Sequence, residues 1–84
     1  MRQYAAGVPV RVRARDGRPV AFALEGETHR VASVEDMREP RVDWWAPTGE
    51  VHRVYFLVVT DRGMVCEIYR DVPSGAWFLG RRYD

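Results

Sequence analysis

The sequence has no lysine, no asparagine, one cysteine and no long apolar run, and each shortage excludes something. A single thiol, Cys66, cannot form a disulfide within the chain, so we expect noncovalent packing in a reducing compartment. No window approaches the roughly 20 apolar residues of a membrane-spanning helix, and the first ten residues do not resemble a signal peptide. We therefore expect a cytoplasmic protein that does not associate with membranes.

The basic residues are all arginine, thirteen against twelve acidic residues, which leaves a net charge of +1. A balance this close to zero does not predict that the whole molecule is steered toward nucleic acid. The charge is uneven, however: residues 1–18 carry five arginines and one acid, whereas residues 25–50 carry seven acids and three arginines. The absence of lysine agrees either with a codon bias or with selection for planar arginine contacts on a binding surface.

Eighty-four residues, of which 46% are apolar and 12% aromatic, suffice for one small folded domain and leave no room for a second core. We expect one β domain over residues 1–84. Within it, residues 1–7 are expected to be a flexible N-terminus and residues 37–50 a long connection between two halves.

Alternation of apolar and polar residues indicates strands through nearly the whole chain. Residues 8–15 alternate valine with arginine, and residues 19–24 follow after a turn. A three-residue turn, Arg15-Asp16-Gly17, brings the large apolar residues onto one face. The pairs that this turn predicts are Val12 with Val20 and Val10 with Phe22.

The next hairpin is predicted to turn through Glu25-Gly26, which places Phe22 opposite His29. The third strand follows from about Glu27. Its alternation falters near Ser33, which predicts either a bulge or a single helical turn over residues 34–38.

The second half predicts three more strands, within residues 51–60, 64–70 and 76–83. A three-residue turn with Gly63 third joins the first two, and it pairs Val58 with Cys66 and Phe56 with Ile68. Both faces of this hairpin are largely apolar, so we expect both to be at least partly covered. In the last strand, alternation sends four side chains to one side: Trp77, Leu79, Arg81 and Tyr83.

These elements predict an all-β fold made of two three-stranded antiparallel meanders. Six short strands of this kind form a strongly twisted sheet that curls into a small barrel or a sandwich.

Three surfaces are candidates for binding. The first is the connection that carries Trp44 and Trp45, with Arg41 and Pro47 nearby. Adjacent side chains on a strand point to opposite faces, so one indole is expected to be structural, Trp45 by our interpretation, and the other free for a protein partner. The alternative is that one indole plugs the barrel end while the other partly covers its outside.

The second candidate surface is basic and consists of Arg11, Arg13, Arg81 and Arg82. It predicts binding to single-stranded nucleic acid, with aromatic side chains stacking on bases. The alternative is a solvated face on which arginine stems cover small residues.

The third candidate surface would join two copies in a homodimer. It consists of apolar and aromatic residues from the second half of the chain, namely Tyr55, Leu57, Tyr69 and Trp77. An exposed aromatic face of this kind usually marks an interface.

The sequence gives little support for catalysis. Cys66 falls on an apolar face, where a thiol behaves as a small hydrophobe. His29 and His52 have no metal-ligand spacing, and the serines lack a nucleophile motif. We expect no enzyme activity, no cofactor and no metal.

Several motifs occur in a characteristic order: PVRV, DGRPVAF, HRV, REP, DWW, CEIYRD, WFL and a terminal YD. With these motifs, about residues 8–84 resemble a small bacterial domain found alone or at the C-terminus of ImuB-type homologues of Y-family DNA polymerases. The resemblance implies association with translesion synthesis or DNA-damage tolerance through protein or nucleic-acid contacts. The sequence has no polymerase acidic motif, so only an accessory role is implied. The function that we expect is a protein-interaction or adaptor module; the alternatives are a nucleic-acid-binding module and a homodimeric structural protein.

Overall fold

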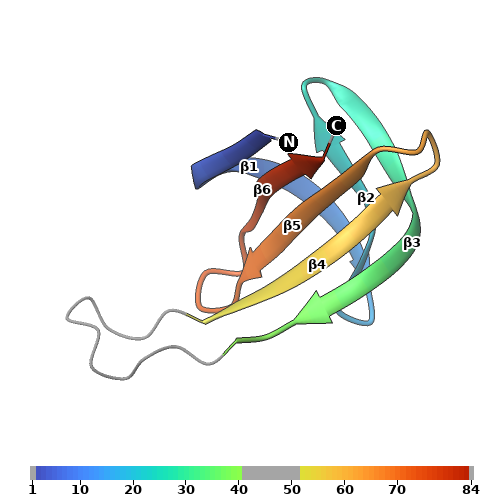
Figure 1. The fold of residues 1–84 in the computed structure, drawn as a ribbon. Coiled ribbons are helices and arrows are strands. Elements are labelled where there is room, and N and C mark those ends of the chain that lie inside the picture. The colour runs from blue at the N-terminus through green and yellow to red at the C-terminus, as the bar shows by residue number, and fades with distance from the viewer. Residues whose placement is uncertain (1, 41–51, 84) are drawn as a thin grey trace.

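The computed structural model describes residues 2–40 and 52–83, which form six antiparallel strands (Figure 1). Each strand pairs with the next along the chain, and β6 returns to pair with β1, so the sheet closes into a barrel. This confirms the predicted all-β fold and decides for a barrel over a sandwich. The strands are β1 (Arg2–Arg15), β2 (Arg18–Leu24), β3 (Glu27–Arg38), β4 (Arg53–Thr60), β5 (Val65–Asp71) and β6 (Trp77–Tyr83).

The turn between β1 and β2 has two residues, so the predicted three-residue turn is wrong. Asp16 and Gly17 both have positive φ, 53° and 78°, which suits the tight turn that matches strand twist. The register then shifts by one residue, because Val20 has no partner between the pairs Ala14–Pro19 and Arg13–Ala21. This bulge places Val12 opposite Phe22, so the large apolar side chains still share one face.

The hairpin between β2 and β3 has the predicted two-residue turn, and Phe22 lies opposite His29. Their rings stack with centroids 5.3 Å apart. β3 then runs as a strand to Arg38, with register shifts after Val31 and after Val34. The bulge predicted for this segment is confirmed, and the alternative of a helical turn is wrong.

The turn between β4 and β5 has the predicted three residues. The amide of Thr60 donates to the Met64 carbonyl at 2.9 Å, and the amide of Gly63 donates to the Thr60 carbonyl at 2.9 Å. Gly63 adopts a φ of 82°, which favours glycine. The predicted pairs of Val58 with Cys66 and Phe56 with Ile68 are confirmed.

The prediction that alternation continues through β6 is wrong, because Gly80 interrupts it. Glu67 pairs with Arg81 and Ile68 with Leu79, so Gly80 is an extra residue in β6. Up to this bulge, Trp77 and Leu79 face the barrel interior. Beyond it, side-chain direction is reversed, so Arg81 faces outward.

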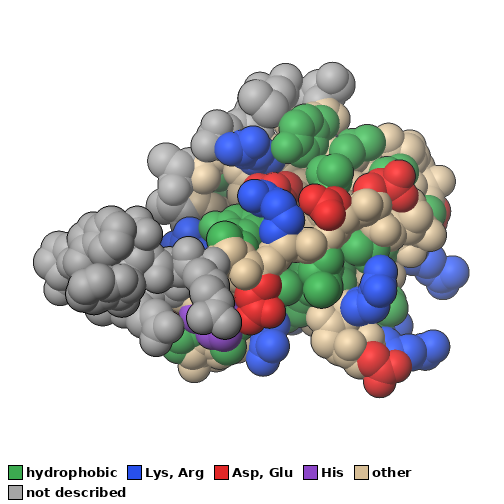
Figure 2. Space-filling view, turned by 60° about the horizontal axis from the view of Figure 1, so that its bottom comes forward, with side chains coloured by type: hydrophobic (Ala, Val, Ile, Leu, Met, Phe, Trp, Pro, Cys, Tyr) green, Lys and Arg blue, Asp and Glu red, His purple; other side chains and the backbone are tan. Residues whose placement is uncertain are grey.

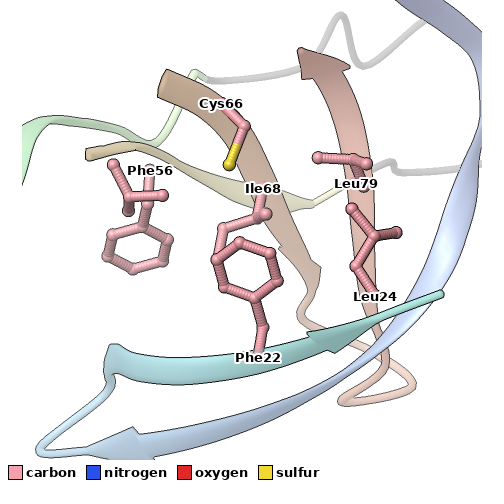
Figure 3. Close-up of a cluster of buried hydrophobic side chains, with 7 residues drawn as sticks. Phe22, Leu24, Phe56, Cys66, Ile68 and Leu79 are labelled. Atoms are coloured by element: carbon pink, nitrogen blue, oxygen red, sulfur yellow. The ribbon is translucent and has the colours of Figure 1, made fainter. Parts of the chain in front are cut away.

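The core lies inside the barrel and draws on β2, β4, β5 and β6. Figure 3 shows Phe22 and Leu24 pointing toward the side chains of Ile68 and Leu79 on the opposite wall. Burying one such side chain contributes roughly 1.5–3 kcal/mol. The buried cluster comprises Phe22, Leu24, Phe56, Val58, Cys66, Ile68 and Leu79.

The seam that closes the barrel joins β1 to β6. Val8, Pro9 and Val10 pair with the start of β6, and after a register shift Arg2 and Gln3 pair with its end. β1 thus begins at Arg2, well before the strand predicted to start at residue 8, and includes most of the segment expected to be flexible. Gly7, at the shift, has a φ of 73° and packs close to Tyr69.

Candidate functional site

The outer side of β3, β4, β5 and β6 carries a dense group of aromatic and charged side chains. Cross-strand register places these residues in adjacent rows, because partners in an antiparallel pair share a face. Two such rows are Asp36–Leu57–Glu67–Arg81 and Arg38–Tyr55–Tyr69–Phe78. We call this surface the aromatic face; its members are Asp36, Arg38, Arg53, Tyr55, Leu57, Glu67, Tyr69, Phe78, Arg81 and Tyr83.

Three rings form a continuous row across the aromatic face. The centroids of Tyr55 and Tyr69 lie 5.2 Å apart, and those of Tyr69 and Phe78 also lie 5.2 Å apart in a stacked arrangement. Aromatic pairs at this separation attract each other beyond their burial of apolar area. Tyr69 lies at the centre of the row and is only 5% exposed.

Arginines lie over two of these rings. The guanidinium carbon of Arg38 is 5.0 Å from the Tyr55 centroid, and that of Arg53 is 4.7 Å from the Tyr69 centroid. Arg53 also donates to the Tyr55 hydroxyl at 3.4 Å, and this hydrogen bond is the main cause that raises the pKa of Arg53. Burial raises the pKa of Tyr69, so its ring stays neutral at physiological pH.

Glu67 is a buried carboxylate at the middle of the aromatic face, 9% exposed. Arg38 Nη2 donates to Glu67 Oε2 at 2.8 Å. Arg81 lies opposite Glu67 in β6, and its pKa is raised first by a hydrogen bond with Tyr83 and then by the Glu67 carboxylate. The Glu67 carboxylate is thus paired with Arg38 and lies opposite a second cation, Arg81, in the sheet.

A shallow pocket of about 290 Å³ opens on this face. Its charged lining, two acids and two arginines, sums to zero, and the rest is aromatic or aliphatic. Figure 2 shows hydrophobic side chains interspersed with charges of both signs on the face that it presents. The pocket is lined by Asp36, Arg38, Tyr55, Leu57, Glu67, Arg81 and Tyr83.

Of the four dimer-surface candidates, Tyr55, Leu57 and Tyr69 come together on the aromatic face. Trp77 lies on the other side of the sheet, where its ring is 5.6 Å from Phe56 in the interior. Phe78 points outward and stacks on Tyr69, in the position for which Trp77 was predicted. Its position opposite Tyr69 is set by the turn between β5 and β6, where the Asp71 amide donates to the Ala76 carbonyl at 2.8 Å.

The four arginines proposed for nucleic acid are not brought together. Arg11 and Arg13 are exposed on β1, opposite Ala23 and Ala21. β1 pairs with β6 as far as Val10, which lies opposite Trp77, the first residue of β6. Arg11 and Arg13 follow Val10, so they lie past the part of β1 that pairs with β6. The other two lie near the end of β6 and on opposite faces: Arg81 points outward and Arg82 pairs with Cys66 on the inner side.

The four residues of the tryptophan surface, Arg41, Trp44, Trp45 and Pro47, lie outside the described residues. The question of which indole is buried therefore stays a prediction.

The groups considered for catalysis have different surroundings. Cys66 is fully buried, and burial raises its pKa to about 11 although Arg82 lowers it. His29 stacks on Phe22, whereas His52 pairs with Glu39 near the ends of β4 and β3. Residues 2–40 and 52–83 contain no cluster of three or more histidine, cysteine or acidic side chains that could hold a metal. The same residues include no helix long and apolar enough to span a membrane.

Comparison with known proteins gave one match. A family model described as a domain of unknown function, DUF6504, matches residues 4–84. No curated protein and no solved structure matches the chain.

Proposed function

This chain belongs to the DUF6504 family of domains, and we propose that it is a non-enzymatic interaction module that docks a protein partner on the aromatic face. The observation that carries the proposal is the pocket at the centre of that face. It is lined by tyrosine, arginine and leucine around an ion pair whose carboxylate is buried and whose arginine is exposed. Tyrosine and arginine are enriched where binding energy concentrates in protein interfaces.

Charge favours a protein over a nucleic acid at this face. In the pocket, Arg38 and Arg81 are offset by Asp36 and Glu67, so its lining has no surplus of positive charge to release counterions from a phosphate backbone. The rings are held by stacking and by cation–π contacts, which lowers the entropy lost when a partner docks. Tyr55, Leu57 and Tyr83 are half-buried and keep accessible surface.

For the partner, we propose an ImuB-type homologue of Y-family polymerases, which places the module in DNA-damage tolerance. This step rests on the resemblance of the motif order PVRV to YD. The aromatic face is the surface through which we propose that this contact forms.

The test is calorimetric titration of the full chain with the ImuB-type homologue encoded in the same genome. Leu57→Ala and Tyr83→Ala truncate side chains that line the pocket. We expect each to weaken binding at least tenfold, and about 30-fold if it removes a hot spot worth 2 kcal/mol. Thr28→Ala is the matched control, because Thr28 is exposed on the first part of β3 and is not a member of the aromatic face.

Absence of binding by the unmodified chain, or equal affinity of all three variants, would overturn the proposal. Sedimentation of the chain at two concentrations tests the alternative that the chain forms a homodimer. If the chain dimerises and Leu57→Ala restores the monomer, the occupant of the aromatic face is a second copy and the polymerase partner is wrong. Circular dichroism of each variant checks that the barrel remains folded.

A further inference from the structure

A second surface, on the part of the barrel formed by β1, β2 and β3, carries five arginines, and the acid next to them is Asp16 in the β1–β2 turn. Arg13 lies opposite Ala21, and Ala21 lies opposite Arg30, so the two arginines flank the same alanine. Arg11 lies two residues before Arg13 on the same side of β1. We call this surface the arginine face; its members, all exposed, are Arg11, Arg13, Arg15, Arg18 and Arg30.

None of these five arginines forms an ion pair with a described residue. Elsewhere in the described part of the chain, Arg38 and Arg62 are paired with acids. Arg15 even lies directly opposite Arg18, and like charges in that position repel. The fold therefore keeps an uncompensated positive charge here, which a bound anion would relieve.

The side chains between the arginines are small. Ala21 is 8% exposed although it lies on the outer face between Arg13 and Arg30, as expected where arginine stems cover a small side chain. The guanidinium groups are thus the outermost groups of this surface. The large hydrophobic side chain that is exposed in the described chain, Met37, lies at the far end of β3.

We propose that the arginine face binds the phosphate backbone of nucleic acid without reading the bases. Two residues of extended strand separate Arg11 from Arg13 by about 6.8 Å, and two strand spacings separate Arg13 from Arg30 by about 10 Å. This regular array of planar cations suits successive phosphates, which guanidinium groups bind through two hydrogen bonds. With no aromatic group on this face to stack on bases, binding is independent of sequence.

A membrane surface fits less well. Proteins that bind anionic lipids through basic residues also insert aromatic or aliphatic side chains, and the arginine face has none exposed. An acidic protein carries the same sign of charge as nucleic acid, and the experiment below distinguishes these two ligands.

The experiment is fluorescence anisotropy of the full chain with a labelled 20-nucleotide thymidine strand and a labelled 20-base-pair duplex, between 50 and 200 mM salt. We expect binding to both, falling steeply as salt rises. Arg13→Gln and Arg30→Gln should each weaken binding about three- to tenfold and lower the log–log salt slope by about 0.7 on the single strand and 0.9 on the duplex. Arg62→Gln is the matched control, since it removes the same charge from an exposed arginine that is paired with Glu27.

Four outcomes would overturn the inference. These are no binding at 50 mM salt, an equal loss for Arg62→Gln, competition by polyglutamate as strong as by unlabelled strand, and tighter binding to phosphatidylglycerol vesicles than to either nucleic acid. Arg13→Gln should leave docking of the polymerase homologue unchanged, because that contact uses the aromatic face. Failure here is thereby distinguished from failure of the proposed function.

Discussion

The thiol of Cys66 shows how strongly the barrel interior acts on a single side chain. It is fully buried beside Val58 and Ile68, and this burial raises its pKa from 9.0 to about 11. The thiolate is the nucleophilic form, so the buried group is unreactive near neutral pH. The sequence was sufficient to place Cys66 among apolar residues, because the turn at Gly63 fixed the register of its strand.

This shift predicts a loss of stability in alkali. The native pKa lies above the unfolded value, so the contribution of the thiol is intact below pH 9 and declines as pH rises toward 11. The full loss is about 2 to 3 kcal/mol for a shift of this size. Urea unfolding at pH 8 and pH 10.5 should show a larger fall for the natural chain than for Cys66→Ala. Parallel curves for the two chains would contradict the prediction.

The charged centre of the aromatic face could be predicted only in part. Alternation holds through β4 and β5, so it is sufficient to put Glu67 on the same side as Tyr55 and Leu57. It could not supply the partners, since Arg38 comes from a strand with two register shifts and Arg81 from beyond the glycine bulge.

Turns could be predicted where a residue at a fixed position is compatible with a single turn geometry, and the register of the adjoining strands then followed. Glycine third in a three-residue turn fixed the β4–β5 hairpin. The β1–β2 hairpin had two solutions that give the same apolar face, a longer turn or a shorter turn with a bulge. The chain uses the bulge at Val20, and hydrophobic pattern alone cannot distinguish the two.

Gly7 offers a test at the level of an element. Gly7 and Gly26 both have positive φ, 73° and 80°, so alanine is strained by about 1 kcal/mol or somewhat more at either position. A Cβ at Gly7 would also meet the Tyr69 hydroxyl and lie 3.1 Å from Phe78 Cβ, whereas a Cβ at Gly26 meets nothing within 4 Å.

We expect Gly7→Ala to lower the free energy of unfolding by about 1 to 3 kcal/mol more than Gly26→Ala, because it overpacks the seam beside the aromatic face. Chemical denaturation of the two variants measures this difference. Equal costs would mean that the strand around Gly7 shifts without penalty.

At the scale of the molecule, the contact that closes the barrel is the strand pairing between the residues most distant in sequence. β1 and β6 close the barrel, with Val8 opposite Leu79 and Val10 opposite Trp77. Local pattern predicted the strands but not this closure, because a barrel and a sandwich need the same alternation. Which residues become neighbours on the two faces depends on that closure as well as on the bulges.

The seam is expected to open only with the whole molecule. Leu79 is fully buried and Val8 and Val10 pack on the core, so separating β1 from β6 would expose the interior to water. Native-state hydrogen exchange should give the most protected amides of the seam the same opening free energy as those of the β4–β5 hairpin. A lower value at the seam would indicate that β1 detaches on its own.

Every strand of the closed ring has two neighbours, so free edges remain only where pairing stops short, as in the first part of β1, which pairs with β6 while its register with β2 begins at Arg11. An extended peptide can add its own backbone only at such a stretch, so that common mode of recognition has little room on this barrel. Over the rest of the outer surface, a partner is recognised through side chains. Selectivity for a partner then depends on a few side chains on the outer surface. These residues can be substituted while the interior stays the same.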